Sequence, residues 1–133
     1  MQKVDHFAFE VSDMDRALEF YTARLGLTLM FRKVDEEHQE AFAFLALDGG
    51  NLELLQNLAP DAPPLGRKEP AAPYCPHLAL VTSNMDKLVQ RVKGKGIDIV
   101  KGPLEAPGLA KWVYLSDPDG NVIEYIQWLE GGH

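Results

Sequence analysis

Two histidines and two glutamates recur in this sequence at one spacing. An offset of 71 residues places His6 over His77 and Glu53 over Glu124. Imidazoles and carboxylates together suit divalent metals of intermediate softness, such as nickel, cobalt, zinc, iron and manganese. A carboxylate beside such a metal is also able to take a proton from carbon and return it elsewhere. The four residues therefore indicate a divalent metal centre that supports proton-transfer chemistry.

The spacing belongs to a longer internal repeat. Residues 6–15 lie over residues 77–86 with five identities, and residues 48–56 lie over residues 119–127 with four identities at the same offset. A single histidine in a strand is more often a satisfied core residue, and a single glutamate more often points to solvent from an edge. The same residue types persist at equal spacing in both copies, which favours a shared ligand role.

The elements that must position these residues follow one order in both copies: a strand, a helix and three further strands. Residues 4–11 form the first strand, because aromatic and β-branched residues alternate there. Ser12 is expected to begin a helix, with a pattern similar to a capping box that Ser83 repeats, and Gly26 and Gly96 are expected to end the two helices. The remaining strands are expected at residues 28–33, 41–47 and 51–57, and at residues 97–101, 111–116 and 121–128.

Strand alternation predicts which way the four residues face. His6 lies on the face opposite Phe7 and Phe9, which pack under the helix, and His77 repeats this arrangement. Glu53 lies between two leucines, and Glu124 lies between Ile123 and Tyr125. A carboxylate among buried neighbours is costly unless a partner compensates it. Two modules packed around a pseudo-twofold axis would bring all four side chains to one point.

Proline marks the boundary between the copies. Residues 59–76 hold six of the nine prolines, which continue neither a helix nor a central strand. We therefore expect a first β-α-β-β-β module at residues 1–58, a Pro-rich linker at residues 59–73 and a second module at residues 74–130. Each module is too small to hold a good core alone, so the two are expected to pair.

Composition excludes several classes of protein. The 133 residues are 46% hydrophobic and 25% charged, which is typical of one globular domain rather than a disordered chain. A net charge of −7 disfavours nucleic acid and anionic membrane surfaces. Cys75 is the single cysteine, so no intramolecular disulfide forms. With no basic, apolar leader at its start, the chain is expected in the reducing cytoplasm.

The sequence resembles the vicinal oxygen chelate superfamily in three features. These are the duplicated order of elements, the early histidine and late glutamate of each copy, and the run Ser-Asp-Pro-Asp-Gly-Asn at residues 116–121. This superfamily includes glyoxalases, methylmalonyl-CoA epimerases, ring-cleavage dioxygenases and bleomycin-resistance proteins. The resemblance covers residues 3–128 and implies one α+β domain, in which the two modules form an open, cup-shaped mixed sheet around a metal. It also implies a homodimer.

The ligand set narrows the resemblance to two branches of the superfamily. Ring-cleavage and fosfomycin-modifying members have two histidines and one glutamate, and bleomycin-binding members lack the set. His6, Glu53, His77 and Glu124 match the lyase and epimerase branches residue by residue. The resemblance implies one divalent metal, of unspecified identity, that stabilises an enediolate on a small substrate with adjacent oxygens. Glu124 is then the principal base and Glu53 the second catalytic carboxylate.

The first expectation is therefore a glyoxalase-like carbon–sulfur lyase that converts a hemithioacetal, a thiol adduct, into a thioester. An epimerase-like isomerase is the second expectation, and a non-catalytic small-molecule-binding protein of the resistance type is the third. Each takes a small molecule as its partner, and none requires nucleic acid or a membrane.

Substrate contacts are harder to assign. Glyoxalases of the best-known type bind a glutathione carboxylate with an arginine four residues after the first histidine, and Glu10 stands there in this sequence. Their asparagine four residues after the first glutamate is present as Asn57. An acid in place of the arginine repels glutathione, so the thiol differs, another cation replaces the arginine, or the substrate is unrelated to glutathione. The candidate substrate-binding residues are Asn57, Arg32, Lys101, Lys111 and Trp112.

Three other residues are interpreted as having no role in the site. Cys75 precedes His77 by two residues, but Pro76 interrupts the strand parity, which favours a free structural thiol. His38 lies in an acidic segment that is typical of a solvated hairpin tip. His133 ends a Gly-Gly-His tail that resembles the start of an expression tag.

Overall fold

The computed structural model describes residues 1–130 of the chain, so the expectation for His133 lies outside the described residues. The chain divides into two compact units, of which the first is Met1–Arg67 and the second begins at Lys68. The boundary lies inside the segment that the sequence assigns to the Pro-rich linker. Residues 59–76 contain turns but neither helix nor strand.

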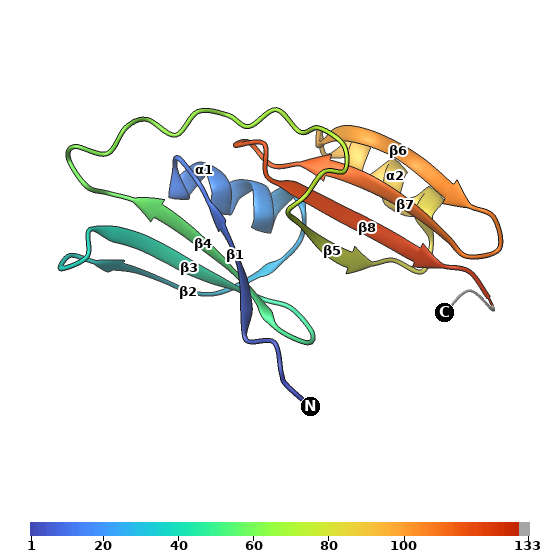
Figure 1. Cartoon of the computed structure of the whole chain (residues 1–133), viewed down its shortest axis with the longest axis horizontal. Helices are drawn as coiled ribbons and strands as arrows, with labels where there is room; N and C mark the ends of the chain where they lie inside the picture. The colour runs from blue at the N-terminus through green and yellow to red at the C-terminus, as the bar shows by residue number, and fades with distance from the viewer. Residues whose placement is uncertain (131–133) are drawn as a thin grey trace. The chain divides into compact units, whose positions relative to one another are not determined.

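The first unit is a four-stranded mixed sheet with the order β1-β4-β3-β2 (Figure 1). Its helical segment is a five-residue α-helix that continues as a π-helix. β1 is parallel to β4, and the other neighbours are antiparallel. The elements are β1 His6–Glu10, α1 Met14–Leu18, η1 Glu19–Arg24, β2 Thr28–Asp35, β3 Glu40–Ala46 and β4 Asn51–Asn57.

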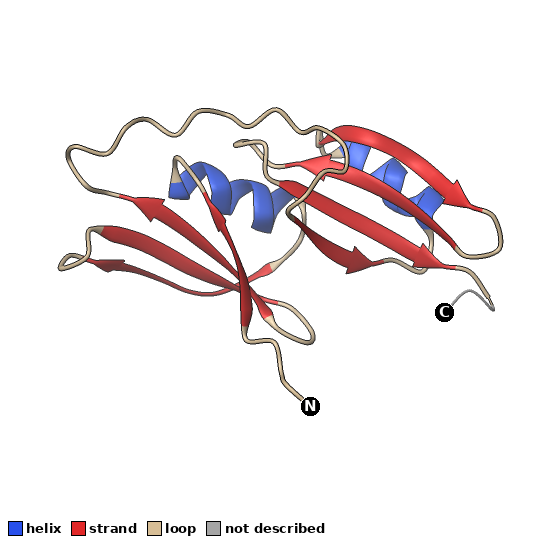
Figure 2. Cartoon of the chain, in the orientation of Figure 1, coloured by secondary structure: helices blue, strands red, loops and turns tan. Residues whose placement is uncertain are grey.

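The second unit repeats the first, with the sheet order β5-β8-β7-β6. β5 is parallel to β8, and the remaining neighbours are antiparallel. Each unit therefore has the strand, helix and three strands that the sequence predicts (Figure 2), and this fold prediction is confirmed. The elements are β5 His77–Val81, α2 Met85–Gly94, β6 Asp98–Ala106, β7 Ala110–Ser116 and β8 Val122–Trp128.

Each sheet buries one face against its own helical segment. In the first unit, Leu52 and Leu54 of β4 are fully buried together with Met14 of α1. In the second unit, Ile123 of β8 and Met85 of α2 are buried in the same way. The opposite face of each sheet is then left to the residues that alternate with this core. His6 and Glu53, and likewise His77 and Glu124, lie on that opposite face.

The helices begin one residue later than the sequence predicts. Asp13, not Ser12, is the N-cap of α1, and its side chain accepts a hydrogen bond from the Arg16 amide. Asn84, not Ser83, caps α2 through the Lys87 amide. Both Asx side chains fill the N-cap role that the serines were expected to fill.

A glutamine from the last strand ties each helix to its sheet. Gln56 Oε1 accepts a hydrogen bond from the Met14 amide at 2.9 Å, and Gln127 Oε1 accepts one from the Met85 amide at 2.9 Å. Each bond satisfies an amide that has no partner within its helix. The glutamines that the repeat preserves are therefore helix anchors, and their side chains lie on the helix face of the sheet.

A buried turn joins β7 to β8 and holds the start of the second unit. Asp117 is 2% exposed, and its Oδ1 accepts hydrogen bonds from the amides of Asp119 and Asn121. The Lys68 amide donates to the Asp119 carbonyl, and Lys68 Nζ donates to Asn121 Oδ1, each at 2.9 Å. This turn therefore fixes the segment that leads towards β5. Within residues 1–130, no helix is long and apolar enough to cross a membrane.

Candidate metal centre

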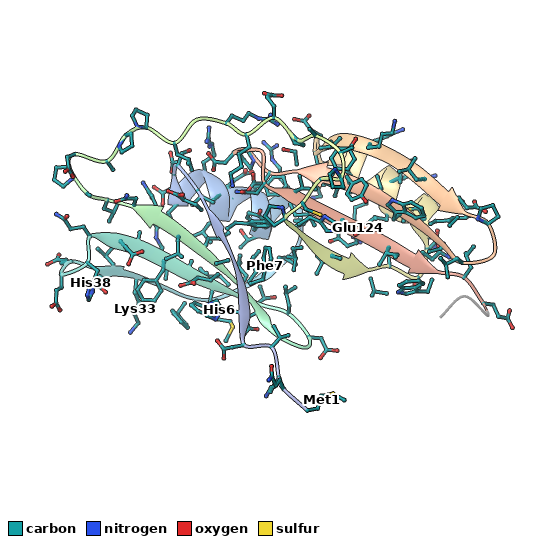
Figure 3. All side chains as sticks on the ribbon, in the orientation of Figure 1. Met1, His6, Phe7, Lys33, His38 and Glu124 are labelled. Atoms are coloured by element: carbon teal, nitrogen blue, oxygen red, sulfur yellow. The ribbon has the colours of Figure 1, made fainter. Side chains whose placement is uncertain are left out.

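The first unit brings His6 and Glu53 together on neighbouring strands. Glu53 is in register with Ala8 of β1, so His6 lies two residues away on the same face. His6 Nε2 lies 3.3 Å from Glu53 Oε1. The Glu53 side chain is only 14% exposed, which confirms that this carboxylate is largely removed from water. Figure 3 labels His6 on β1.

The second unit builds an equivalent pair. Glu124 of β8 is in register with Ala79 of β5, which places His77 on the same face two residues earlier. His77 Nε2 lies 2.9 Å from Glu124 Oε1, and the Glu124 side chain is 12% exposed. The same two elements therefore present the same two side chains in both units. Figure 3 labels Glu124 on β8.

The remaining ring nitrogen of each histidine has its own partner. His77 Nδ1 lies 3.0 Å from the carbonyl oxygen of Tyr74, which only accepts, so Nδ1 carries the hydrogen. His6 Nδ1 lies 2.7 Å from Asp5 Oδ2. The hydrogen bond to Asp5 is the main reason that the pKa of His6 is raised, and the charge of Glu53 raises it further. Metal-binding histidines commonly donate the other ring N–H to a carboxylate or carbonyl in this way.

These donor atoms fit a divalent metal. Two ligands that share one metal at about 2.1 Å, with angles between 90° and 110°, have donor atoms about 3.0–3.4 Å apart. The observed separation of 3.3 Å in the first unit lies within this range, and that of 2.9 Å in the second unit lies just below it. Each unit supplies one nitrogen and one carboxylate, and residues 1–130 contain no group of three or more His, Cys, Asp or Glu side chains placed to hold a metal.

The ring that faces each glutamate differs between the units. Phe44 is directly opposite Glu53, and its ring lies 5.2 Å from that of His6. Tyr114 is directly opposite Glu124, and its ring lies 5.5 Å from that of His77. Burial is the main reason that the pKa of Tyr114 is raised, followed by the charge of Glu124, so the hydroxyl is protonated at neutral pH.

The sequence comparison missed the match between these two rings. An offset of 71 relates the histidines and the glutamates, whereas an offset of 70 relates Phe44 to Tyr114. The turn after β7 is one residue longer than the turn after β3, which shifts the alignment. Allowing one inserted residue in the Asp-Pro-Asp-Gly turn would have revealed the match.

Two of the candidate substrate-binding cations lie on the helix face of their sheets. Arg32 Nη1 forms a 2.6 Å ion pair with Asp15 of α1. Lys111 is in register with Gln127, whose side chain reaches the first residue of α2. The structure therefore does not bring Arg32 or Lys111 to the face that carries the His–Glu pairs.

Two other candidates do share the face of the second pair. Lys101 of β6 is directly opposite Tyr114, at the position where the first unit has Phe31 opposite Phe44. Trp112 lies two residues before Tyr114 on the same face of β7. The face of the second unit is thus more polar than that of the first.

Asn57 lies at the end of β4, beside a hollow in the first unit. Its Oδ1 accepts a hydrogen bond from the Ala59 amide at 2.9 Å, which shapes the exit of the chain from the sheet. The hollow has a volume of about 370 Å³, and its lining includes Glu10 and Glu40. Glu10 lies on the same face of β1 as His6. The hollow beside Asn57 therefore presents carboxylates, which would repel an anionic group of a substrate.

His38 and Cys75 have local partners. His38 lies in the turn between β2 and β3, and its Nδ1 is 2.8 Å from Asp35 Oδ2. This hydrogen bond is the main cause that lowers the pKa of Asp35. Cys75 is an exposed free thiol whose Sγ lies 3.6 Å from the Pro73 carbonyl oxygen.

Known proteins share this architecture. Residues 3–125 match the Glyoxalase/Bleomycin resistance protein/Dioxygenase superfamily. A lactoylglutathione lyase of Arabidopsis thaliana is 30% identical over 128 residues, which span 92% of this chain and 43% of that protein. A virulence protein of Salmonella typhimurium is 30% identical over 97% of this chain and 86% of its own length. A lactoylglutathione lyase of Escherichia coli is 26% identical over 96% of this chain and 93% of its own length.

Solved structures give the same picture of the fold. The crystal structure of SMU.1112c has a TM-score of 0.77 at 26% identity, covering 95% of this chain and 98% of that one. TnmS3, an antibiotic-binding protein from Streptomyces, has a TM-score of 0.70 at 27% identity, covering 97% of this chain and 98% of that one. The similar proteins thus include enzymes as well as a binding protein.

Proposed function

The chain belongs to the glyoxalase/bleomycin resistance protein/dioxygenase superfamily, and from this premise we propose that it is a divalent-metal-dependent lyase acting on a small hemithioacetal. The observation that carries the proposal is the recurrence of one His–Glu pair, with the same register and similar burial, in both units. Lactoylglutathione lyases among its relatives support this branch of the family.

His6, Glu53, His77 and Glu124 are the residues that would hold the metal. Their nitrogen and carboxylate donors suit nickel, cobalt, zinc, iron or manganese. The bound ion would supply positive charge beside two adjacent substrate oxygens, which lowers the cost of the enediolate. The partners of the outer ring nitrogens, Asp5 and the Tyr74 carbonyl, keep Nε2 of each histidine directed at its glutamate.

Glu124 is the principal base in this proposal. Its carboxylate takes the proton from the substrate carbon that bears sulfur and delivers it to the neighbouring carbon. The hydroxyl proton passes from the oxygen of the first carbon to the oxygen of the second, so the hemithioacetal becomes a thioester with no atom gained or lost. Glu53, in the equivalent position of the first unit, is the second carboxylate and assists the proton transfer.

The acidic hollow of the first unit restricts which thiol the hemithioacetal substrate contains. Glu10 and Glu40 line it together with Asn57, and a glutathione carboxylate placed there would meet like charge. Of the three cations considered, Lys101 is the one on the face of a His–Glu pair. We therefore expect that the part of the thiol that enters this hollow carries no carboxylate. Trp112 and Lys101 would contact the substrate from the second unit.

The number of metal ligands in each unit guides the assembly that we propose. Because each unit supplies two of the four ligands, two pairs must meet to complete a site, either within one chain or across two copies. We propose a homodimer as the working assembly. The protein partner that we propose is a second copy of the same chain, and the function requires neither nucleic acid nor a membrane.

A binding function is the second candidate. The similarity to an antibiotic-binding protein favours it at the level of the fold and sequence. A binding protein of this kind would need neither bound metal nor a base. An epimerase that removes and replaces one proton beside a thioester carbonyl would use the same four residues as the lyase.

Turnover of a substrate panel tests the proposal. Metal-loaded protein should isomerise hemithioacetals formed from methylglyoxal, faster with a neutral or cationic thiol than with glutathione, because Glu10 and Glu40 repel carboxylates. Thioester formation is followed by absorbance, beside methylmalonyl-CoA epimerisation and oxygen uptake with catechols. Chelator-stripped protein is the control. Methylmalonyl-CoA turnover alone would assign an epimerase, and no turnover with tight binding of an antibiotic would assign a binding protein.

A further inference from the structure

Tyr74 lies three residues before His77, in the segment that leads into β5. We propose that Tyr74 is a positioning residue, whose ring and backbone carbonyl together hold the His77 imidazole in the orientation that a metal ligand needs. This inference rests on the proposed metal-dependent function. In it, Tyr74 touches neither the metal nor the substrate and acts only through His77.

The backbone contact is the first support. His77 Nδ1 lies 3.0 Å from the Tyr74 carbonyl oxygen, which leaves Nε2 facing Glu124 Oε1 at 2.9 Å. Tyr74 has φ of +65°, in the left-handed region that bulky residues rarely adopt. Such a conformation costs energy and persists only where the surroundings fix it. A further contact must therefore hold the Tyr74 backbone in the conformation that meets His77.

The ring of Tyr74 makes that contact. It packs on the ring of Tyr114, with 4.6 Å between the centroids and 35° between the planes. The ring of Tyr114 in turn meets that of His77 edge to face at 5.5 Å. Tyr74 thus contacts His77 directly through its carbonyl and indirectly through Tyr114. Because the ring and the carbonyl belong to one residue, a side chain too small to reach Tyr114 also releases the carbonyl.

The segment that carries Tyr74 is itself tied down within the second unit. At its start, the Lys68 amide donates a hydrogen bond to the Asp119 carbonyl at 2.9 Å. Nearer its end, the Tyr74 amide donates to the Ala71 carbonyl at 2.8 Å. These backbone bonds limit the movement of the segment as a whole, so the ring of Tyr74 has only a local rotation to restrain.

The first unit holds its histidine in another way. His6 Nδ1 pairs with Asp5 Oδ2, and the side chain of Asp5 is 89% exposed. The ring beside His6 is that of Phe44, and Phe31 of β2 stacks on it at 5.1 Å. In the first unit the ring and the Nδ1 partner therefore come from two residues, whereas Tyr74 supplies both in the second.

Three substitutions of Tyr74 test the proposal through metal affinity, measured by calorimetry with zinc, nickel and cobalt. Tyr74→Ala should weaken binding about 10- to 100-fold, the range typical of losing a partner of a metal-binding histidine. Tyr74→Gly should lose as much, although glycine adopts a positive φ without strain, because it also lacks the ring. Tyr74→Phe keeps the ring and should retain wild-type affinity.

Phe31→Ala is the matched control. It removes the ring that stacks beside the other histidine, yet leaves Asp5 in place as the partner of His6 Nδ1. Its metal affinity should therefore fall less than that of Tyr74→Ala. Urea unfolding of every variant shows that the proteins compared are folded.

Nuclear magnetic resonance of the zinc-saturated, ¹⁵N-labelled protein gives a readout specific to His77. Its Nδ1 proton is held by the Tyr74 carbonyl and should exchange slowly with water in wild type, Tyr74→Phe and Phe31→Ala. The same proton should exchange faster in Tyr74→Ala and Tyr74→Gly. A loss of general stability alone would not single out this proton.

The outcomes separate this inference from the proposed function. If wild type binds metal and Tyr74→Ala and Tyr74→Gly bind it equally well, the positioning role is wrong and the metal centre stands. Wild-type affinity in Tyr74→Gly alone would assign the loss in Tyr74→Ala to backbone strain and would also overturn the role of the ring. An equal loss in Phe31→Ala would overturn it as well. If wild type binds none of the three metals, the proposed function fails and this inference fails with it.

Discussion

Substitution of Glu124 by glutamine should lower kcat for hemithioacetal isomerisation by at least about 1,000-fold, the upper part of the range for removing a general base. The amide lacks the negative charge and the basic lone pair that accept the proton. Its oxygen nevertheless still fills the place of the carboxylate oxygen, so metal is retained. Steady-state kinetics and elemental analysis of the same preparation measure the two effects together.

Glu53→Gln is the matched control for this variant. Glu53 also pairs with a histidine, occupies the equivalent strand position in the first unit and has nearly the same exposure, 14% against 12%. If Glu124 is the principal base, Glu53→Gln should lower kcat less than Glu124→Gln does. Unaffected turnover in Glu124→Gln would remove this residue as the base, and equal losses in both variants would make the two carboxylates equivalent.

Substitution of Gly120 by alanine is expected to destabilise the second unit by about 3 kcal/mol or more, at the severe end for a single change. Gly120 has φ of +82°, which an alanine adopts only with strain. A Cβ at this position would overlap the Lys68 carbonyl oxygen and lie 2.8 Å from the carbonyl carbon. The obstacle is backbone, so Lys68 must leave the turn and lose its bonds to Asp119 and Asn121.

The Gly49→Ala variant separates the cost of backbone strain at positive φ from the cost of a steric clash with Lys68. Gly49 has φ of +85° in the matching turn of the first unit, and nothing lies within 4 Å of the site where its Cβ would be. This variant should cost only about 1 kcal/mol. Urea unfolding measures both losses, and amide exchange in β7 and β8 locates the larger one. Equal destabilisation by the two substitutions would show that the contact with Lys68 contributes nothing.

The sequence predicts the fold well because each module carries redundant local signals. β4 was predicted at residues 51–57, the range that the structure gives it, because a turn with two glycines precedes it and leucines alternate along it. The helix caps were misplaced by one residue. Ser12 and Asp13 are both good N-caps, and the choice between them depends on where Gln56 binds the first helical amide, a contact 42 residues distant.

The site was predictable in part. Repetition identified the two histidines and the two glutamates, and strand alternation gave the faces on which they lie. Arg32 and Lys111 were expected near the substrate from charge alone, whereas their strand parity turns them towards the helices. The role of the Tyr74 carbonyl was not predictable, because a backbone contact to His77 leaves no signal in residue types. Phe44 and Tyr114 were hidden by the inserted residue in one turn.

Metal titration of the wild-type protein tests the central claim most directly. If His6, Glu53, His77 and Glu124 form one site, metal-free protein takes up one divalent ion per chain, and His6→Ala and His77→Ala each remove tight binding although they lie in different units. Calorimetry with nickel, cobalt and zinc gives the stoichiometry and the affinity. Failure of the wild type to bind any of these ions, or tight binding that survives both substitutions, would contradict the account.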